Sequence, residues 1–232
     1  RRYQMPELWQ EDASAYCMRK ATDHCINLGG KLSKTQGRAF HFNLGAEFGM
    51  SGKDAGMLNV DFDTDLNFKF LGDTVRLAAK AFFHRTTPRF FQESYHSKHL
   101  WWDKSLSAET RTHLEGIFSY DKTNTTLRIA IDEIQNYTYF GMNYALDASS
   151  YARQAMTAMV CQESGNINVL TAQLSQTFRL GVLNWENVIT YQNSSNKDAL
   201  PLPSLNVFSN LFLKFRIARV LNVELGGCCT FF

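Results

Sequence analysis

Three alternating carboxylates form the most chemically suggestive pattern in this 232-residue chain. Asp61, Asp63 and Asp65 have the D-x-D-x-D spacing with which a calcium-binding loop begins, where oxygen ligands from alternate positions surround the ion. Such a loop also requires a glycine and a final bidentate glutamate, and Leu66 and Gly72 stand at those two positions. The spacing therefore indicates a solvated face of a β-strand and not a calcium site.

A short segment rich in histidine and tryptophan is the second feature that could do chemistry. Tyr95–Asp103 contains His96, His99, Trp101 and Trp102. Imidazole is a common metal ligand and indole has an apolar face with a polar edge, so a metal or sugar site is one interpretation. A packed constriction or a loop at the rim of a larger structure explains the same residues and is favoured. No metal ligand set is assigned.

The other reactive residues form no catalytic or cofactor motif. The chain lacks the nucleophile-elbow, zinc-protease, phosphate-loop and dinucleotide-binding signatures. Its five cysteines are odd in number, Cys228 and Cys229 are adjacent, and Cys17, Cys25 and Cys161 lack zinc-type spacing. We therefore expect no enzymatic activity, no cofactor and no metal site.

Composition excludes further classes of protein. Lys and Arg number 24 against 22 Asp and Glu, so no basic field points to a nucleic-acid partner. Hydrophobic residues make up 44% of the chain and 18 residues are Phe, which is too apolar for a disordered chain. No apolar run reaches the ~18 residues that a membrane-spanning helix requires.

The dominant pattern is a hydrophobic period of two residues, which indicates β-strands with one apolar and one polar face. In Arg38–Met50, Phe and Leu alternate with polar residues and Gly, and Leu58–Phe70 repeats the pattern. The same reasoning predicts ten strands, over 25–34, 38–50, 58–70, 75–84, 111–120, 126–132, 170–180, 183–192, 205–217 and 220–231.

Strand length and the order of the connections favour a membrane barrel. Most of the predicted strands have ~9–13 residues, whereas strands of soluble sheets centre on ~5–6 and tilted strands that cross a bilayer need ~9–11. Short turns alternate with longer links over 51–57, 85–108, 141–165 and 193–203. In an up-and-down barrel, alternate connections lie at the same rim. Residues 143–163 are ambiguous and could be partly helical.

Matching the apolar faces predicts the register of two hairpins. Around Leu71–Thr74, Phe70 is expected opposite Val75, which sets Asp65 against Lys80 and Asp61 against His84. In the first hairpin, Leu32 is expected beside Phe40 and Leu28 beside Leu44.

The orientation of the two faces decides between a soluble and a membrane barrel. A soluble ligand-binding barrel would have to pack many Phe side chains inside one small lumen. In a membrane barrel the same side chains face lipid, and aromatic residues near the strand ends form the expected girdles. The polar face would then line a water-filled path and tune its ion selectivity. The pore-lining candidates are Glu47, Asp61, Asp63, Asp65, Lys69, Arg76, Lys80, Arg111 and Arg128.

Several stretches resemble one known family. Leu44–Gly49, Leu71–Arg85, Tyr95–Asp103, Asp132–Met142 and Gly181–Gln192 are similar to segments of the putative porin family of Bacteroidetes outer membranes. The resemblance spans most of the chain, from about Leu8 to Gly226. Members of that family are usually longer, with a signal peptide ahead and more strands behind, so we expect this chain to be a mature form or a fragment.

The resulting expectation is an all-β, antiparallel up-and-down transmembrane β-barrel of about ten strands, which could be part of a larger barrel. Residues 25–232 would form the barrel strands, and residues 1–24 a plug, a loop or a short helix. The expected function is passive diffusion of small hydrophilic solutes through the bacterial outer membrane, with lipid and solutes as partners. The alternative is a non-channel barrel that acts as a scaffold or adhesin, its lumen plugged by Arg85–Ala108 and residues 1–24.

Overall fold

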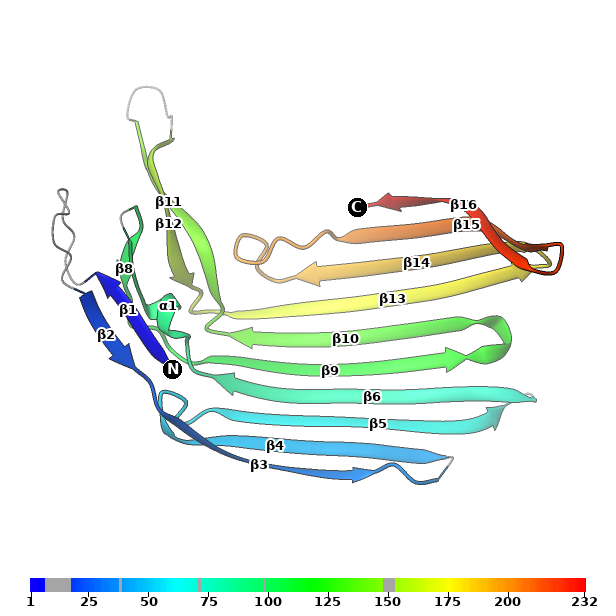
Figure 1. Ribbon diagram of the computed structural model, residues 1–232, viewed down its shortest axis with the longest axis horizontal. Coiled ribbons are helices and arrows are strands. Elements are labelled where there is room, and N and C mark those ends of the chain that lie inside the picture. Colours follow the sequence, from blue (N-terminus) through cyan, green and yellow to red (C-terminus); the bar gives the residue numbers. More distant parts are fainter. Residues whose placement is uncertain (7–17, 38, 71, 98, 148–152) are drawn as a thin grey trace.

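Ten long strands form one antiparallel sheet in the computed structural model, which describes residues 1–6, 18–37, 39–70, 72–97, 99–147 and 153–232 (Figure 1). Their spatial order, β16-β15-β14-β13-β10-β9-β6-β5-β4-β3, follows their order along the chain. The strands are β3 (Cys25–Lys34), β4 (Phe40–Gly52), β5 (Leu58–Phe70), β6 (Asp73–Thr86), β9 (Glu109–Tyr120), β10 (Thr125–Gln135), β13 (Asn166–Leu180), β14 (Leu183–Ser194), β15 (Leu205–Ile217) and β16 (Leu221–Phe231). The predicted all-β class and the ten predicted strands are confirmed.

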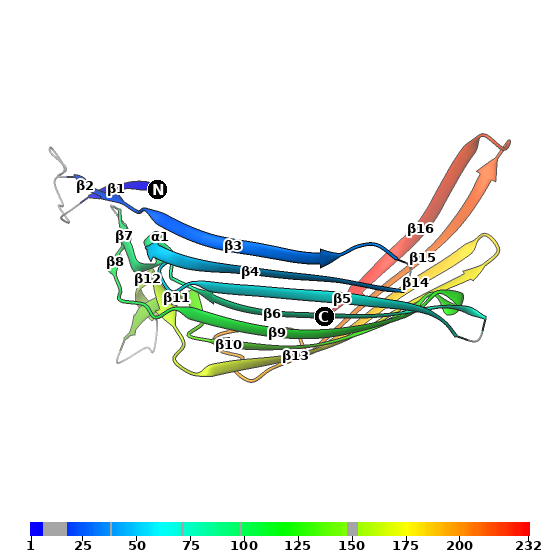
Figure 2. The same cartoon turned by 90° about the horizontal axis from the view of Figure 1, so that it is seen from below.

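The sheet is curved and has two edges. Figure 2 shows it as a trough, with β10 and β13 along the bottom and β14 to β16 rising behind them. Within the described part of the chain, β3 pairs with β4 alone and β16 with β15 alone. The strands therefore form an up-and-down meander. Within the described residues, no pairing between β3 and β16 closes the sheet into a ring.

The connections divide the sheet into two rims, as the sequence predicts. Residues 35–39, 71–72, 121–124, 181–182 and 218–220 join strands at what we call the short-turn rim. Residues 53–57, 87–108, 136–165 and 195–204 join them at the opposite end, the long-link rim. The first turn and the first link are of equal length, so the alternation of short and long begins at the second pair of connections.

Three accessory hairpins and a short helix gather at the long-link rim (Figure 1). The hairpins pair β1 (Arg2–Pro6) with β2 (Met18–Thr22), β7 (Ser94–His96) with β8 (Trp101–Asp103), and β11 (Thr138–Leu146) with β12 (Arg153–Gln162). The helix is α1 (Phe90–Glu93), and a 3-10 turn, η1 (Asp121–Thr123), lies in a short turn. No described helix is long and apolar enough to cross a membrane.

The accessory hairpins account for two segments that the sequence left ambiguous. Residues 143–163, which the sequence left ambiguous between strand and partly helical structure, form the strand residues 143–146 of β11 and 153–162 of β12, and 148–152 lie outside the described residues. Residues 2–6 and 18–22 of the N-terminal segment pair as a hairpin, and 7–17 lie outside the described residues. Its role as a plug stays a prediction.

The two predicted hairpin registers are wrong by an even number of residues. Phe68, and not Phe70, lies opposite Val75, because pairing already begins between Phe70 and Asp73. In the first hairpin Leu32 lies opposite Leu44, because the turn is longer than predicted and pairing begins between Lys34 and Phe42. An even shift leaves every side chain on its predicted face, since side chains alternate with a period of two.

A small apolar core lies at the long-link rim. Ile134, Ile167 and Val169 project from β10 and β13, and Ala199 from the last long link covers them. Ile167 is fully buried, and tyrosines and leucines from the neighbouring links pack around this cluster. The core anchors the links to the end of the sheet.

Two adjacent glycines test the packing of the last strand pair. A Cβ at Gly226 would lie 2.4 Å from Phe212 Cβ and 2.3 Å from Leu211 O, whereas a Cβ at Gly227 would meet nothing within 4 Å. We expect Gly226→Val to destabilise the folded chain by about 1–3 kcal/mol through overpacking. The matched control, Gly227→Val, is expected to change stability little. Urea titration of the chain refolded into lipid vesicles measures both, and equal effects would contradict the packing.

Candidate functional site

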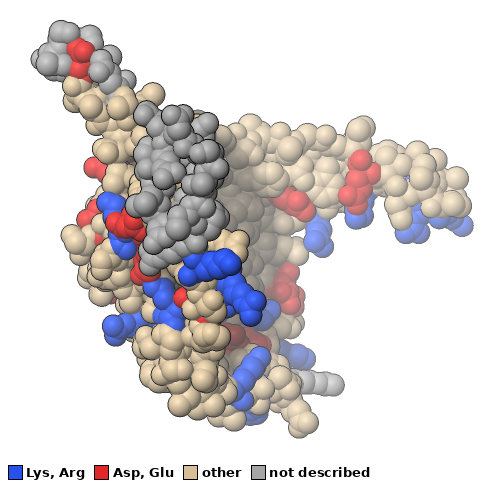
Figure 3. All heavy atoms as spheres, turned by 60° about the vertical axis from the view of Figure 1, so that its left-hand side comes forward, with Lys and Arg blue, Asp and Glu red and all other residues tan. Residues whose placement is uncertain are grey.

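The strand registers separate the sheet into an apolar face and a polar face. Directly paired residues share a face, so Phe62 opposite Leu44 and Asp63 opposite Asn43 extend two opposite surfaces across the strands. The apolar face exposes Phe, Leu and Ile side chains along the whole sheet, with Ile131 at 52% and Phe178 at 46% exposure. In Figure 3, Lys, Arg, Asp and Glu side chains of the arm at the right lie on the side that faces the hollow.

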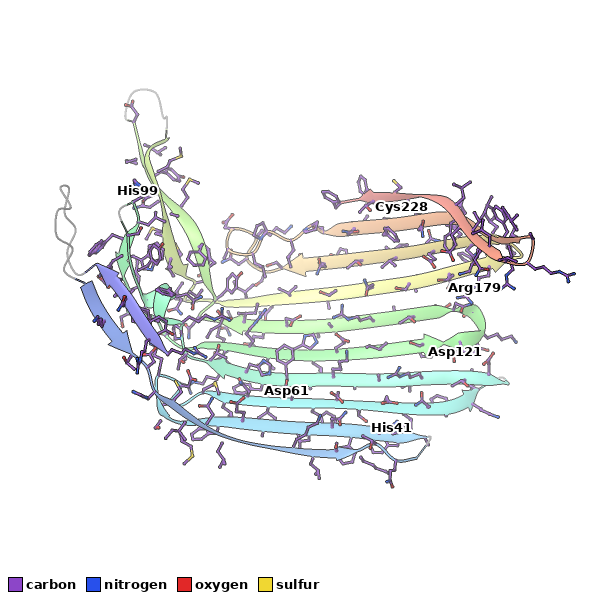
Figure 4. The ribbon with its side chains drawn as sticks, viewed as in Figure 1. His41, Asp61, His99, Asp121, Arg179 and Cys228 are labelled. Carbon is purple, nitrogen blue, oxygen red and sulfur yellow. The ribbon has the colours of Figure 1, made fainter. Side chains whose placement is uncertain are left out.

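All nine pore-lining candidates lie on the polar face. On β4, β5 and β6 these are Glu47, Asp61, Asp63, Asp65, Lys69, Arg76 and Lys80, and on β9 and β10 they are Arg111 and Arg128. Asp61 lies between the rims, whereas His99 lies at the long-link rim and Asp121 and Arg179 at the short-turn rim (Figure 4). Whether the nine side chains line a water-filled path stays a prediction.

The three alternating carboxylates are each held by a different polar neighbour. Asp61 Oδ1 lies 2.8 Å from His84 Nε2, and Asp63 Oδ2 accepts a hydrogen bond from Asn43 Nδ2 at 2.6 Å. Asp65 Oδ2 lies 3.2 Å from His41 Nδ1, and Asp65 Oδ1 lies 4.0 Å from Arg76 Nη2. The predicted facing pairs Asp65–Lys80 and Asp61–His84 are replaced by Asp63–Lys80 and Asn59–His84. Asp61 and His84 still meet diagonally.

Glu115 is the centre of the strongest charge cluster on the polar face. Its side chain is 4% exposed, and Oε2 accepts a hydrogen bond from Arg128 Nη2 at 2.6 Å. Lys80 Nζ lies 3.7 Å from Oε1, and His113 Nε2 lies 3.3 Å from Oε2. A buried carboxylate requires such partners, because its desolvation is costly. The cluster joins β6, β9 and β10.

A stack of three rings continues the cluster towards Asp61. Phe82 lies between His84 and His113, with ring centroids 4.4 and 4.7 Å apart. His113 Nδ1 is 2.7 Å from Asp132 Oδ1, so each histidine also contacts a carboxylate. The stack and the ion pairs together form one network across β5, β6, β9 and β10.

The remaining pore-lining candidates lie outside this network. Glu47 Oε1 accepts a hydrogen bond from Asn27 Nδ2 at 2.9 Å, near the β3 edge. Arg111 lies opposite His84, and its Nε is 3.9 Å from Glu109 Oε1. Lys69 lies opposite Thr74, near the short-turn rim. The nine residues therefore share a face but do not converge on one point.

The loop candidates form a packed unit at the long-link rim. His96 is buried, stacks on Trp101 with 3.7 Å between ring centroids, and places Nε2 2.8 Å from Asp103 Oδ2. Trp102 is also buried, stacks on Tyr95 and donates a hydrogen bond to the Phe91 carbonyl at 3.2 Å.

His99 lines a cavity beside this packed unit. The cavity has a volume of about 480 Å³, and Trp101 and Trp102 also line it. Across the cavity, Asn143 and Thr157 belong to the β11–β12 hairpin. His96 therefore serves packing, the two tryptophans both pack and line the cavity, and His99 belongs to the cavity lining.

Metal and disulfide chemistry finds no support in the described part of the chain. There, no group of three or more His, Cys, Asp or Glu side chains is arranged to hold a metal ion. Cys25, Cys161, Cys228 and Cys229 are free thiols, and Cys17 lies outside the described residues. Burial, with Cys161 nearby, raises the pKa of Tyr139 in the β11–β12 hairpin, so this phenol stays protonated at neutral pH.

Sequence reasoning missed the residues that organise the polar face. Glu115, His113 and Asp132 were not among the candidates, although the period of two places them on the same face as Arg111 and Arg128. Their burial and mutual contacts depend on the register between β6, β9 and β10.

The comparison with known families gives one match. A family model described as "Putative porin" matches residues 2–232. No curated protein and no solved structure matches the chain.

Glu115 provides a test of the charge cluster. Glu115→Gln removes the charge that balances Arg128, and we expect it to lower the free energy of unfolding by about 1–3 kcal/mol. Glu224→Gln is the matched control, because Glu224 pairs with Lys214 at an exposed position where ion pairs contribute about 0–1 kcal/mol. Urea titration in lipid vesicles compares the two, and a larger loss for Glu224→Gln would contradict the assignment.

Proposed function

The chain belongs to the putative porin family, and on that premise we propose that its sheet forms the wall of a β-barrel in the bacterial outer membrane. Small hydrophilic solutes would diffuse passively along the polar face, while the apolar face contacts outer-membrane lipid. The observation that carries the proposal is the separation of the two faces over all ten strands.

The distribution of charge on the apolar face supports a lipid contact. Of its residues within the strands, the charged ones are Lys34, Asp73, Arg85 and Glu133, and each lies at or near a strand end. The band between them consists mainly of Leu, Ile, Val, Phe, Ala and Tyr. A charged residue at the membrane midplane costs about 2–4 kcal/mol, so an uncharged central band is expected of a lipid-facing surface.

Three side chains with polar groups within the apolar band satisfy one another. Trp185 Nε1 donates to Ser209 Oγ at 2.9 Å, and Ser209 Oγ donates to Asn187 Oδ1 at 2.9 Å. All three residues lie on the apolar face of β14 and β15. In hydrocarbon, polar groups without partners cost several kcal/mol, so this chain of hydrogen bonds makes the positions compatible with lipid.

Strand length fits the same assignment. The ten strands have between 10 and 15 residues, and tilted strands of about 9–11 residues cross the apolar layer of a bilayer. The two sheet edges cannot face lipid, because their backbone groups would lack hydrogen-bond partners. In the proposed barrel, the edges of β3 and β16 are therefore where the ring continues and closes.

The polar face supplies a lining for water and solutes. It carries both signs of charge from β4 to β10, and many of these groups are partnered across strands, as for Glu115 and Arg128. Mixed, partnered charges favour broad permeation of small hydrophilic solutes over tight binding of one of them.

A non-channel scaffold with a plugged lumen remains the second candidate, and the packing at the long-link rim favours it. Tyr3 of the N-terminal hairpin stacks on Phe90 with 4.1 Å between centroids and meets Phe91 edge-on at 5.3 Å. The N-terminal hairpin is thus attached to the link over residues 87–108, and the two could act together as a plug.

Two adjacent residues of β14 test which face meets lipid. Ile189 lies on the apolar face, and Thr190 on the polar face between Gln173 and Asn206. We expect Ile189→Arg to destabilise the chain in lipid vesicles by about 2–4 kcal/mol, because the charge enters the apolar layer. Thr190→Arg is expected to cost less than about 1 kcal/mol. Urea titration in vesicles compares them, and the reverse order would refute the proposed orientation.

Channel activity is tested in planar bilayers with the chain reconstituted from detergent. Discrete conductance steps are expected, as water-filled barrels allow ions to pass. A folded, membrane-inserted chain without conductance would contradict the diffusion function. In that case a variant with residues 87–108 replaced by a short turn separates the candidates, because a plugged barrel should gain permeability to sugars in a swelling assay.

A further inference from the structure

A pocket lies where the polar face meets the long-link rim. Its volume is about 400 Å³, within the range of small-molecule sites. The sheet contributes His84 and Thr86 from β6 and Glu109 and Arg111 from β9, and the link after β6 contributes residues 87–89 and Gln92. Tyr137 and Thr138 of the next link complete the lining.

Hydrogen bonds between the links hold this pocket in shape. Asn136, at a left-handed φ of 55°, donates from Nδ2 to the Ala108 carbonyl at 3.0 Å. The Thr138 amide donates to Glu109 Oε2 at 3.1 Å, and the Tyr137 ring stacks on Tyr139. The backbone of Arg89 donates to Gln92 Oε1 at 2.8 Å, which fixes the start of α1. These hydrogen bonds therefore fix segments of two links against the ends of β6 and β9.

Two guanidinium groups give the pocket its charge. Arg111 has one weak ion pair, with Glu109 at 3.9 Å, and half of its side chain is exposed. For the Arg89 guanidinium, the structure gives no hydrogen bond or ion pair with another described residue. Arginine forks bind carboxylates and phosphates in a bidentate geometry, so both groups can still bind an anion.

The other polar groups of the pocket are already partnered or can donate. Glu109, the acidic residue in the lining, accepts the Thr138 amide and lies beside Arg111. His84 directs Nε2 to Asp61 at 2.8 Å. The Thr87 hydroxyl donates to Asp54 Oδ1 at 3.5 Å. The Gln92 amide nitrogen and the Tyr137 hydroxyl are further polar groups of the lining.

We propose that this pocket binds the carboxylate or phosphate group of a small anionic solute between Arg89 and Arg111. The inference rests on the proposed function for its place on a solute path, since the pocket lies where that path would meet the long-link rim. Binding itself requires no transport. The pocket would concentrate small anions at this rim and let them leave easily, because a site on a diffusion path must bind weakly.

Inorganic phosphate is the probe, and the full chain in maltoside micelles is the sample. Broadening of the phosphorus NMR line on titration reports binding, since the detergent contains no phosphorus. We expect Arg89→Gln combined with Arg111→Gln to weaken binding by about tenfold, through loss of both guanidinium forks. Glu109→Gln is expected to strengthen binding several-fold, because it removes the negative charge but keeps an acceptor for the Thr138 amide.

Arg179→Gln is the matched control. It removes the same charge from the polar face, but Arg179 lies at the short-turn rim, far from the pocket (Figure 4). It is expected to bind phosphate like the parent chain. If the double variant does not fold, the single variant Arg89→Gln, at an exposed link position, takes its place in the titration and is also expected to weaken phosphate binding. No binding by the parent chain, or equal weakening by Arg179→Gln, would overturn the inference.

Conductance measured on the same preparations keeps the two proposals apart. Conductance without phosphate binding would refute the inferred anion site and leave the proposed diffusion function in place. If phosphate binding depends on Arg89 and Arg111 but the chain shows no conductance, the anion site stands and the diffusion function fails.

Discussion

Every strand of the sheet has to serve two environments, because successive side chains point to opposite faces. The ten strands form nine pairings, and all nine set the mainly apolar face of one strand beside the mainly apolar face of the next. A one-residue slip at any pairing would transfer a whole strand of Phe and Leu to the polar face. Because the side-chain alternation of all ten strands is matched in this way, a single sheet can have one lipid-facing and one water-facing surface. The proposed function depends on this match.

The polar face is organised by contacts between strands. Glu115 lies nearly buried between Arg128, Lys80 and His113, so the charges that could attract solutes also hold β6, β9 and β10 together. The two arginines of the rim pocket lie outside this network. Among the described residues Arg111 pairs with one carboxylate, Glu109 at 3.9 Å, and Arg89 belongs to a link. Structural charges and available charges therefore occupy different parts of the same surface.

The sequence predicted the strands well and their partners less well. Alternation located all ten strands and the face of every pore-lining candidate, because it is a local property of each segment. The registers around Gly72 and Gly37 were wrong, because matching apolar faces restricts a register only to steps of two, and turn geometry selects among them. The β11–β12 hairpin was missed, since its Ala- and Met-rich strands alternate weakly.

The sequence by itself determined the two-faced character of the sheet and the family, because the period of two and the motifs can be read without knowing which strands meet. Only the tertiary structure decided that Glu115 becomes the buried centre of a charge cluster and that the side chains of His96 and Trp102 are buried. It alone brought Arg89 of a link and Arg111 of β9 into the lining of one pocket. These outcomes depend on contacts between residues far apart in the chain, and cross-strand register and link packing set such contacts.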